Sequence, residues 1–348
     1  MKAIILNKPG DFVITEIPTP EVQADEVLMR IVTSGICVND VRDFKGDNKH
    51  SFPRLGGHEF CGVIDKLGSD VDAKKFPIGQ KVVSYVMDTC KTCHICRRGM
   101  ENICLNMATS KTLQNPDGIS GYGGFAEYIA VKAADLLFYP ADADFERMAF
   151  TEPLACVVNS VNRADIRFGD DVLVIGGGTM GLLHVMLAKL KGARVILSEP
   201  MKDRRDKALS LGCDIAVEPK NLRAELDALT DGRGADVVFN TTAIPAVAKE
   251  AVELTAAGGK VNMFSSMHPN KPVEVDMGKV HSWQRTIFGT ANSAVSDYDQ
   301  AVLLIGKKIF DPTPLIEKIF PFADFGKAIE TASRPDTYKV ILQFGSIK

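Results

Sequence analysis

The fold is decided by the segment Asp171-Val172-Leu173-Val174-Ile175-Gly176-Gly177-Gly178-Thr179-Met180-Gly181. An apolar strand runs directly into a glycine cluster, and an apolar helical stretch follows from Met180 to Leu190. The glycines fit G-x-G-x-x-G, where the first makes a tight turn, the second lets the backbone approach a pyrophosphate and the third lets helix pack on strand. The segment therefore predicts a dinucleotide site, with these cofactor-binding residues: Gly176, Gly178, Thr179, Met180 and Gly181.

The next strand, residues 194–198, ends at Glu199, 21 residues after Gly178. A carboxylate at this place accepts hydrogen bonds from an adenosine ribose and repels a 2′-phosphate, which favours NAD over NADP. Lys202, Arg204 and Arg205 oppose this preference, because they could attract such a phosphate. We count Glu199 and Arg204 as cofactor-binding residues; the alternative is a flavodoxin-like turn with Glu199 at a solvated strand end.

Strands and helices alternate from about residue 165 to Gly289, which predicts a parallel sheet covered on both faces. Residues 1–150 contain closely spaced short strands and turns, typical of a β barrel or sandwich. A last strand at 338–344 could return to that β domain and make it discontinuous. The predicted fold is α/β, with a β-rich domain over 1–157 and 293–348 and a doubly wound Rossmann domain over 158–292.

The composition is that of an ordinary globular protein of 348 residues, with 45% hydrophobic and 24% charged residues. Lys plus Arg number 41 and Asp plus Glu 44, so the net charge is −3, which argues against a nucleic-acid partner. Apolar stretches break within about ten residues, too short for a membrane span. The N-terminal sequence lacks a signal-peptide pattern, so we expect a cytoplasmic protein.

Four of the eight cysteines form a cluster with the spacing C-x2-C-x2-C-x7-C, within a lobe over residues 88–106. Four thiolates on one short loop predict a closed, tetrahedral structural zinc site. An Fe–S cluster is the rival, but the last spacing differs from the ferredoxin pattern and no proline follows the fourth cysteine. A nucleic-acid-binding zinc ribbon conflicts with the net charge. The predicted ligands are Cys90, Cys93, Cys96 and Cys104.

A second set of metal-binding residue types is dispersed along the chain. Cys37 lies in Gly-Ile-Cys-Val-Asn-Asp, His58 in Gly-Gly-His-Glu-Phe, and Glu152 in Thr-Glu-Pro-Leu. A lone residue of any of these types is usually only packed in a core. Together, one cysteine, one histidine and one or two carboxylates could form an open zinc site with room for a substrate.

The chain resembles the zinc-dependent medium-chain alcohol and polyol dehydrogenases of the sorbitol and threonine dehydrogenase type. The resemblance covers essentially the whole chain and rests on motifs that occur in the family's order. They are Gly57-His58-Glu59 with Gly62, Gly68 and Val71, the four-cysteine lobe, Gly124-Phe125-Ala126-Glu127-Tyr128, Glu152-Pro153-Leu154 and the glycine segment.

The resemblance implies a GroES-like catalytic domain, two zinc ions per chain and NAD as hydride acceptor. It implies Cys37, His58 and Glu152 as catalytic-zinc ligands, and Glu59 as a ligand directly, through water or in an alternate coordination. Asp40 corresponds to an acid that orients the zinc-bound imidazole. It also implies a homodimer or homotetramer, with strands at 260–266 and 285–291 at a sheet edge.

One position departs from the family pattern. Relatives usually carry Ser or Thr two residues after the zinc cysteine, and often His five after it, as a proton relay; here Asn39 and Arg42 stand there. Asn39 could orient a substrate hydroxyl while Glu59 or water takes the proton, and His50 is a candidate substitute for the relay. We therefore keep Asn39 among the catalytic residues.

The expected pocket lining is polar and favours a small polyhydroxylated substrate: a sugar alcohol, sugar acid or cyclitol. Basic residues near position 50 could bind a phosphate, so polyol phosphates remain possible substrates. Two other classes remain as alternatives, a non-catalytic dinucleotide-binding homologue or sensor and a zinc-independent enone reductase. The candidate lining is Asn39, Arg42, Phe52, Tyr122, Glu152 and Asn292.

Overall fold

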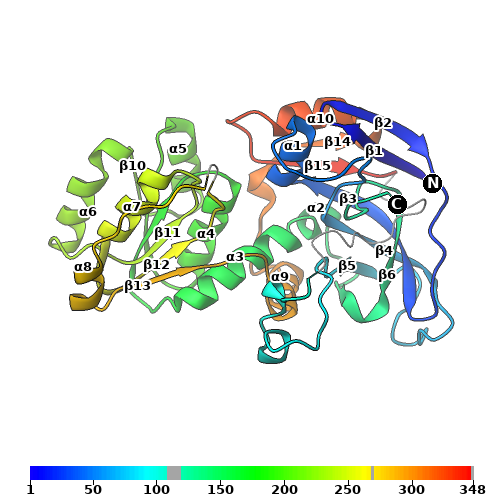
Figure 1. Ribbon diagram of the computed structural model, residues 1–348, viewed down its shortest axis with the longest axis horizontal. Coiled ribbons are helices and arrows are strands. Elements are labelled where there is room, and N and C mark those ends of the chain that lie inside the picture. Colours follow the sequence, from blue (N-terminus) through cyan, green and yellow to red (C-terminus); the bar gives the residue numbers. More distant parts are fainter. Residues whose placement is uncertain (108–118, 268–269, 346–348) are drawn as a thin grey trace. The chain divides into compact units, whose positions relative to one another are not determined.

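The computed structural model describes residues 1–107, 119–267 and 270–345. The chain forms two compact units, one of residues 1–155 and 293–348 and the other of residues 156–292. The boundary between them falls within one helix, α3 (Thr151–Ala164). Figure 1 shows the β-rich unit at both ends of the colour scale and the second unit in the greens and yellows between them. We refer to them below as the β-rich unit and the dinucleotide unit.

The dinucleotide unit contains a six-stranded parallel sheet in the order β10-β9-β8-β11-β12-β13. Numbered within this sheet, the order is 3-2-1-4-5-6, that of a doubly wound Rossmann sheet. β8, the strand of the deciding segment, is buried along its whole length. Its strands are β8 (Asp171–Ile175), β9 (Arg194–Ser198), β10 (Ile215–Val217), β11 (Ala235–Asn240), β12 (Thr255–Met263) and β13 (Thr286–Gly289).

Helices connect the parallel strands, as a crossover requires. α4 packs against β8 and β9, α5 against β9 and β10, and α7 against β11 and β12. The core includes Leu173, Ile196, Leu226, Val238 and Val261, all inaccessible to solvent. The helices are α4 (Thr179–Leu190), α5 (Lys202–Ser210), α6 (Leu222–Thr230), α7 (Pro245–Glu253) and α8 (Met277–Ser282).

The β-rich unit contains a seven-stranded sheet, β14-β15-β3-β4-β5-β7 with β6 also paired to β3, and a two-stranded sheet of β1 and β2. The C-terminal strand β15 pairs with β3 in antiparallel register, so the prediction that the chain returns to this domain is confirmed (Figure 1). The strands are β1 (Lys2–Lys8), β2 (Asp11–Glu16), β3 (Glu26–Ile36), β4 (Glu59–Leu67), β5 (Lys81–Ser84), β6 (Tyr128–Lys132), β7 (Leu136–Phe138), β14 (Ile316–Pro321) and β15 (Lys339–Gln343).

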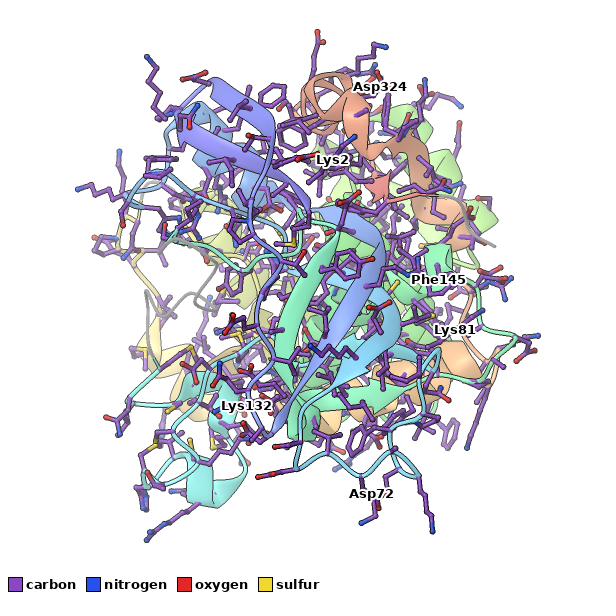
Figure 2. The ribbon with its side chains drawn as sticks, turned by 90° about the vertical axis from the view of Figure 1, so that its right-hand side faces the viewer. Lys2, Asp72, Lys81, Lys132, Phe145 and Asp324 are labelled. Carbon is purple, nitrogen blue, oxygen red and sulfur yellow. The ribbon has the colours of Figure 1, made fainter. Side chains whose placement is uncertain are left out.

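Short helices close the β-rich unit. One of them, α2, is tied to the sheet by Lys81 of β5, whose ammonium lies 4.7 Å from the ring centroid of Phe145 and donates to the carbonyl of Ala143 at 2.7 Å. Figure 2 labels Lys81 and Phe145 side by side. The helices are α1 (Val38–Lys45), α2 (Phe145–Met148), α9 (Val295–Gly306) and α10 (Phe325–Ala332).

α7 ends at Glu253, because the amide of Ala235 bonds the carbonyl of Leu254 and draws residues from Thr255 onward into β12. The structure differs from the sequence-based expectation near the N-terminus. The first 150 residues were expected to be strands and turns, yet they contain α1, an eight-residue helix whose apolar residues are Val38, Val41 and Phe44. Among the described residues, no helix combines the length and the apolar character that a membrane span needs.

Candidate active site

Cys37 lies where β3 ends and α1 begins. Its backbone N–H donates to one carboxylate oxygen of Asp40 at 2.9 Å, and the other oxygen accepts the N–H of Gly57 at 3.2 Å. Asp40 is itself buried. One carboxylate therefore fixes the backbone at Cys37 and at the residue before His58, although these positions are far apart in the sequence.

His58 and Glu59 lie where β4 begins, beside the end of β3. Glu59 is buried and pairs with Lys339 of β15, whose Nζ lies 2.7 Å from its Oε1 and 2.5 Å from its Oε2. Burial alone would lower the pKa of Lys339, but the surrounding acidic groups, Glu59 foremost with Cys37 and Glu152, together outweigh burial and raise the pKa. A Cβ at Gly35, the β3 residue paired with Glu59, would lie 2.2 Å from that carboxylate, so glycine makes room for the ion pair.

The side chains of Cys37, His58 and Glu59 form a group whose ligand atoms all lie within 4.8 Å of one another. Sulfur, imidazole nitrogen and carboxylate oxygen are the donor types that zinc prefers. Burial raises the pKa of the Cys37 thiol. Cys37 is partly exposed while His58 and Glu59 are buried. By donor chemistry the group fits a zinc ion with an open position.

Glu152 is the second residue of α3 and is half-buried. It does not belong to the group of three, whose carboxylate is that of Glu59. Its negative charge nonetheless helps to raise the pKa of His58 and the pKa of Lys339. The structure thus brings all four predicted residues of this site into one neighbourhood, with Glu59 closest to Cys37 and His58 as a ligand set.

Two residues of the expected substrate lining lie near this group. Asn39 is exposed on the first turn of α1, and its carbonyl accepts the Nδ2 amide of Asn48 at 3.3 Å. The ring of Tyr122 packs against His58, with 5.2 Å between the ring centroids. The neighbourhood of Cys37 and His58 therefore includes both a polar amide and an aromatic ring.

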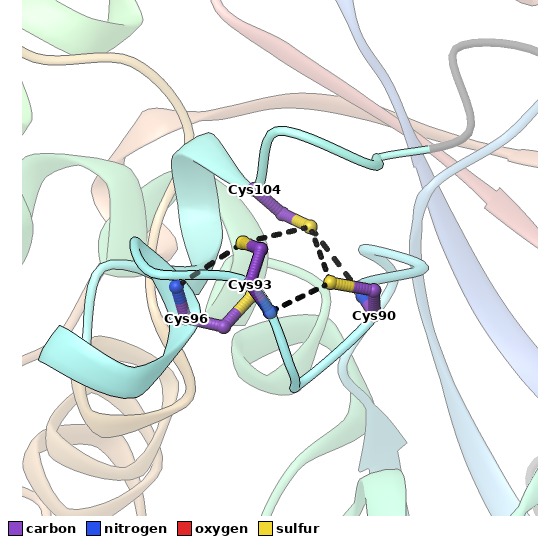
Figure 3. A group of neighbouring side chains, drawn as sticks. All are labelled: Cys90, Cys93, Cys96 and Cys104. Carbon is purple, nitrogen blue, oxygen red and sulfur yellow. Dashed lines mark hydrogen bonds between the residues drawn. The ribbon is translucent and has the colours of Figure 1, made fainter.

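The four-cysteine lobe is built from two short 3₁₀ turns, η1 (Cys96–Arg98) and η2 (Glu101–Ile103), and the loops around them. All four sulfurs lie within 4.8 Å of one another, and Figure 3 shows them converging on one point. The Sγ atoms of Cys93 and Cys104 are 3.9 Å apart and those of Cys90 and Cys104 3.5 Å. A tetrahedron with Zn–S bonds of about 2.3 Å needs sulfurs about 3.8 Å apart, so the group fits zinc.

Backbone amides also point at these sulfurs. The amide of Cys93 donates to Cys90 and that of Cys96 to Cys93. Hydrogen bonds from the backbone and side chain of Thr92 and from the backbone of Cys93 lower the pKa of Cys90 to about 5, whereas burial and neighbouring thiols raise that of Cys96 to about 12. Zinc binds thiolates, so a cation bound here would release the protons that the thiols retain.

The glycine segment has the geometry that its spacing predicts. A Cβ at Gly181 would lie 1.9 Å from the carbonyl oxygen of Gly176, so the helix and the strand turn are in close contact. Gly176 itself has φ of 104°, which favours glycine. A Cβ at Gly178 would meet only Arg204, at 3.7 Å, so the loop is open there. Thr179 and Met180 follow as the first residues of α4, where free N–H groups favour phosphate.

Glu199 lies against this loop and is buried. Its carboxylate accepts the N–H of Gly177 at 2.7 Å and that of Met201 at 2.9 Å. Of the three basic residues that follow, Arg205 donates to the carbonyl of Glu199 and pairs with Glu218, and Lys202 pairs with Asp206. Arg204 is the one whose guanidinium lies beside Gly178.

Two features of the β-rich unit escaped the sequence analysis. Lys339 lies in a C-terminal strand that is otherwise apolar, and a lone lysine among buried strand residues was the only signal of a buried partner. Asp43, one turn after Asp40, is buried and accepts hydrogen bonds from Asn48, His50 and Arg54. Neither pairing follows from a sequence motif, because each joins residues from different elements.

Comparisons with known proteins agree with this architecture. Residues 23–141 match the family model described as alcohol dehydrogenase GroES-like domain, and residues 179–307 match that described as zinc-binding dehydrogenase. The chain is 32% identical to 2-dehydro-3-deoxy-L-galactonate 5-dehydrogenase of Pseudoalteromonas atlantica over 88% of this chain and 87% of the relative. It is 31% identical to L-threonine 3-dehydrogenase of Bacillus subtilis over 98% of each.

A solved structure extends the likeness to the whole fold. The protein named short chain alcohol dehydrogenase from Escherichia coli CFT073, in complex with NADH, is 27% identical and superimposes with a TM-score of 0.89 over 99% of each chain. The alignments cover both units and nearly every residue of the relatives. The chain belongs to the zinc-binding, medium-chain alcohol dehydrogenase family.

Proposed function

We propose that this protein transfers a hydride between a secondary alcohol and NAD, with one catalytic and one structural zinc ion per chain. The observation that carries the proposal is the group of Cys37, His58 and Glu59, an S, N, O set of three ligands, which leaves a fourth coordination position for a substrate. A zinc-independent enone reductase has no use for this group. Metal analysis distinguishes the two: two zinc ions per chain support the dehydrogenase, and one supports the reductase.

In this proposal each residue of the two metal groups has a separate role. Cys37, His58 and Glu59, with Glu152 beside them, hold the catalytic ion, and Cys90, Cys93, Cys96 and Cys104 hold the structural one. When bound, zinc polarises the substrate hydroxyl and makes its proton more acidic, and NAD accepts the hydride. Asp40 keeps the backbones at Cys37 and Gly57 in place. Lys339 compensates the charge of Glu59 and holds its carboxylate in one orientation.

The proton leaves by a route other than the usual hydroxyl relay. Asn39 carries an amide, which cannot pass on a proton as a hydroxyl does, and Glu59 is engaged by Lys339. We therefore propose that water at the exposed first turn of α1 accepts the proton of the substrate hydroxyl. Asn39 then serves to bind a substrate hydroxyl. Arg42, at the second relay position, is half-buried on the same helix.

The substrate is a small polyhydroxylated molecule: a sugar alcohol, sugar acid or cyclitol, with polyol phosphates as the alternative. The polar residues Asn39 and Glu152 near the ligand group support this class, as does the sugar-acid substrate in the name of the Pseudoalteromonas relative. The test is NADH formation, followed by absorbance, over a panel of polyols, sugar acids and their phosphates with zinc present. Silence across the panel with zinc bound would instead support a non-catalytic homologue.

NAD is the proposed cofactor, because the buried carboxylate of Glu199 lies against the loop that would hold the pyrophosphate, where it could accept hydrogen bonds from the adenosine ribose. Glu199→Ala removes the ribose acceptor and the repulsion against a 2′-phosphate, while Arg204 remains beside Gly178. We expect kcat/KM to shift from NAD toward NADP by about tenfold or more, equivalent to one hydrogen bond to a charged group. An equal loss for both cofactors would show that Glu199 does not select between them.

The proposal includes a homodimer or homotetramer in the cytoplasm. β13 ends the sheet of the dinucleotide unit and, among the described residues, pairs with β12 alone, so its other edge is free for a second copy. All eight cysteines are free thiols, as a reducing compartment requires. Light scattering of the purified protein tests the oligomeric state.

A further inference from the structure

A second buried carboxylate lies on α1, one turn after Asp40. The side chain of Asp43 is only 8% exposed. Its Oδ1 accepts hydrogen bonds from Nδ2 of Asn48 and Nδ1 of His50, both at 2.7 Å, and its Oδ2 accepts one from Nε of Arg54 at 2.8 Å. All three donors belong to the segment 48–54, so a single carboxylate fixes this segment against α1. Loss of that carboxylate would leave the largely buried guanidinium of Arg54 without this acceptor.

The same segment contacts both sides of the candidate active site. At its start, Asn48 also donates to the carbonyl of Asn39, two residues after Cys37. At its end, the hydroxyl of Ser120 donates to the carbonyls of Ser51 at 3.1 Å and Pro53 at 3.3 Å. Two residues beyond Ser120, the ring of Tyr122 packs on His58. The carboxylate of Asp43 thus holds a segment connected to the neighbours of both Cys37 and His58.

The hydrogen bond to Asp43 also fixes the tautomer of His50. Asp43 is paired with Arg54 and accepts, so Nδ1 of His50 carries a proton, and in the neutral imidazole Nε2 keeps a lone pair. The imidazole is 41% exposed whereas Asp43 is buried. His50 therefore offers a hydrogen-bond acceptor of fixed orientation on the accessible side of the segment.

We propose that Asp43 is a positioning residue and that His50 is a specificity-determining residue, whose Nε2 accepts a hydrogen bond from a substrate hydroxyl other than the one being oxidised. The inference rests on the proposed function and narrows its substrate class. A neutral acceptor suits a hydroxyl, and Arg54, one of the basic groups that could meet a phosphate, is already paired with Asp43. The inference therefore favours unphosphorylated polyols over polyol phosphates.

The test compares polyols with an alcohol that has a single hydroxyl. kcat/KM is measured with NAD for sorbitol, galactitol and gluconate, and for 2-butanol, in the wild type, His50→Phe, His50→Gln, Asp43→Asn and the double variant Asp43→Asn/His50→Phe. Asp47→Asn, an exposed carboxylate nearby, is the matched control. We expect His50→Phe to lower kcat/KM for the best polyol by 10- to 100-fold, as when a hydrogen-bonded substrate hydroxyl loses its partner, and to leave 2-butanol within about twofold.

His50→Gln retains an acceptor, so its loss should be smaller than that of His50→Phe. Asp43→Asn should resemble His50→Phe, and the double variant should be no worse than the worse single one, because both act through the same contact. Equal losses for polyol and 2-butanol would indicate a merely structural role and overturn the inference. A wild type that oxidises nothing in the panel would instead overturn the proposed function.

A measurement independent of activity checks the positioning step. Long-range nitrogen–proton NMR of histidine-labelled protein reports the tautomer of each imidazole. We expect the Nδ1–H tautomer for His50 in the wild type and a mixture of tautomers in Asp43→Asn. A wild-type His50 in the Nε2–H form would overturn the inference, because that nitrogen would then donate rather than accept.

Discussion

The two groups of metal-ligand side chains in the β-rich unit are built in opposite ways. The four-cysteine lobe lies between residues 90 and 104, and its sulfurs are held by amides of the same loop. The other group joins Cys37 at the end of β3 to His58 and Glu59 at the start of β4, and Glu59 is held by Lys339 of β15. The first group therefore depends on local spacing, whereas the second depends on the correct pairing of three strands.

The difference extends to what each group can do. Four thiols complete a tetrahedral shell, so a metal bound there contributes its binding free energy to folding. Three ligands leave a position open for substrate, so a metal bound there contributes chemistry. The comparison makes separable predictions for stability and for activity.

The largest expected effect is on the activity of Cys37→Ser. We call Cys37, His58 and Glu59 the open group. Loss of one of its ligands should lower kcat/KM at least about 10³-fold, because the ion that polarises the substrate would be lost or displaced. The melting temperature should change by no more than about 2 °C, since the lobe and the sheet remain intact. Steady-state kinetics and calorimetry measure the two quantities, with Cys213→Ala, a buried cysteine of the dinucleotide unit, as the control. A variant with normal activity would remove Cys37 from the active site.

Cys93→Ser should show the reverse pattern. A shell with three thiolates no longer holds its ion firmly, so zinc content should fall from two ions per chain to one. The melting temperature should fall by about 10 °C or more, because the lost binding free energy was folding free energy. Zinc analysis and calorimetry on the same sample provide the test. Unchanged zinc content and melting temperature would contradict the structural assignment of the lobe.

Lys339→Met tests the long-range support of the open group. Glu59 and Lys339 are both almost completely buried, so removing the ammonium leaves an uncompensated buried carboxylate. We expect a loss of about 3–5 kcal/mol in the free energy of unfolding, measured by urea denaturation. The double variant Glu59→Gln/Lys339→Met should recover part of this loss, and Lys308→Met, which breaks the exposed pair with Asp142, should cost less than about 1 kcal/mol. A similar small cost for Lys339→Met would show that the pair does not support the site.

The contrast also explains what the sequence could predict. The lobe and the glycine loop are local, so the spacing of Cys90 to Cys104 and of Gly176 to Gly181 was enough to predict that these residues gather in space. The alternation of strands and helices likewise predicted the parallel Rossmann sheet, and this fold is confirmed. Motif order and family resemblance suggested that Cys37, His58 and Glu152 come together, but spacing alone could not.

The sequence could not predict the residues that hold the open group in place, and the reason is physical. Lys339 reaches Glu59 only because β15 and β4 flank β3 on opposite sides, and strand neighbours are set by tertiary packing. α1 was missed because its eight residues, most of them polar, are too few for a periodic pattern to stand out. Its start is stabilised by Asp40, whose carboxylate accepts the amide of Cys37, a contact that becomes visible only in three dimensions.

The smallest expected effect concerns Asn39, the residue that distinguishes the open group from those of its relatives. Asn39→Ser introduces the hydroxyl that relatives usually carry. If a hydroxyl relay were the best proton path here, the substitution would raise alcohol oxidation near neutral pH, since acid–base groups contribute about 10²–10⁴-fold. Asn39 is exposed on α1, and its backbone carbonyl already binds Asn48. Its amide side chain is better suited to binding a substrate hydroxyl.

We therefore expect Asn39→Ser to lower kcat/KM on the best polyol by about tenfold, the cost of one hydrogen bond to substrate. A simple secondary alcohol such as 2-butanol should be unaffected or slightly better, because it has no second hydroxyl for the amide to bind. The measurement is kcat/KM of wild type and variant on both substrates. A rise for both would restore the relay interpretation. Unchanged values for both would show that Asn39 neither relays nor recognises, and would leave the open group with its ligands alone.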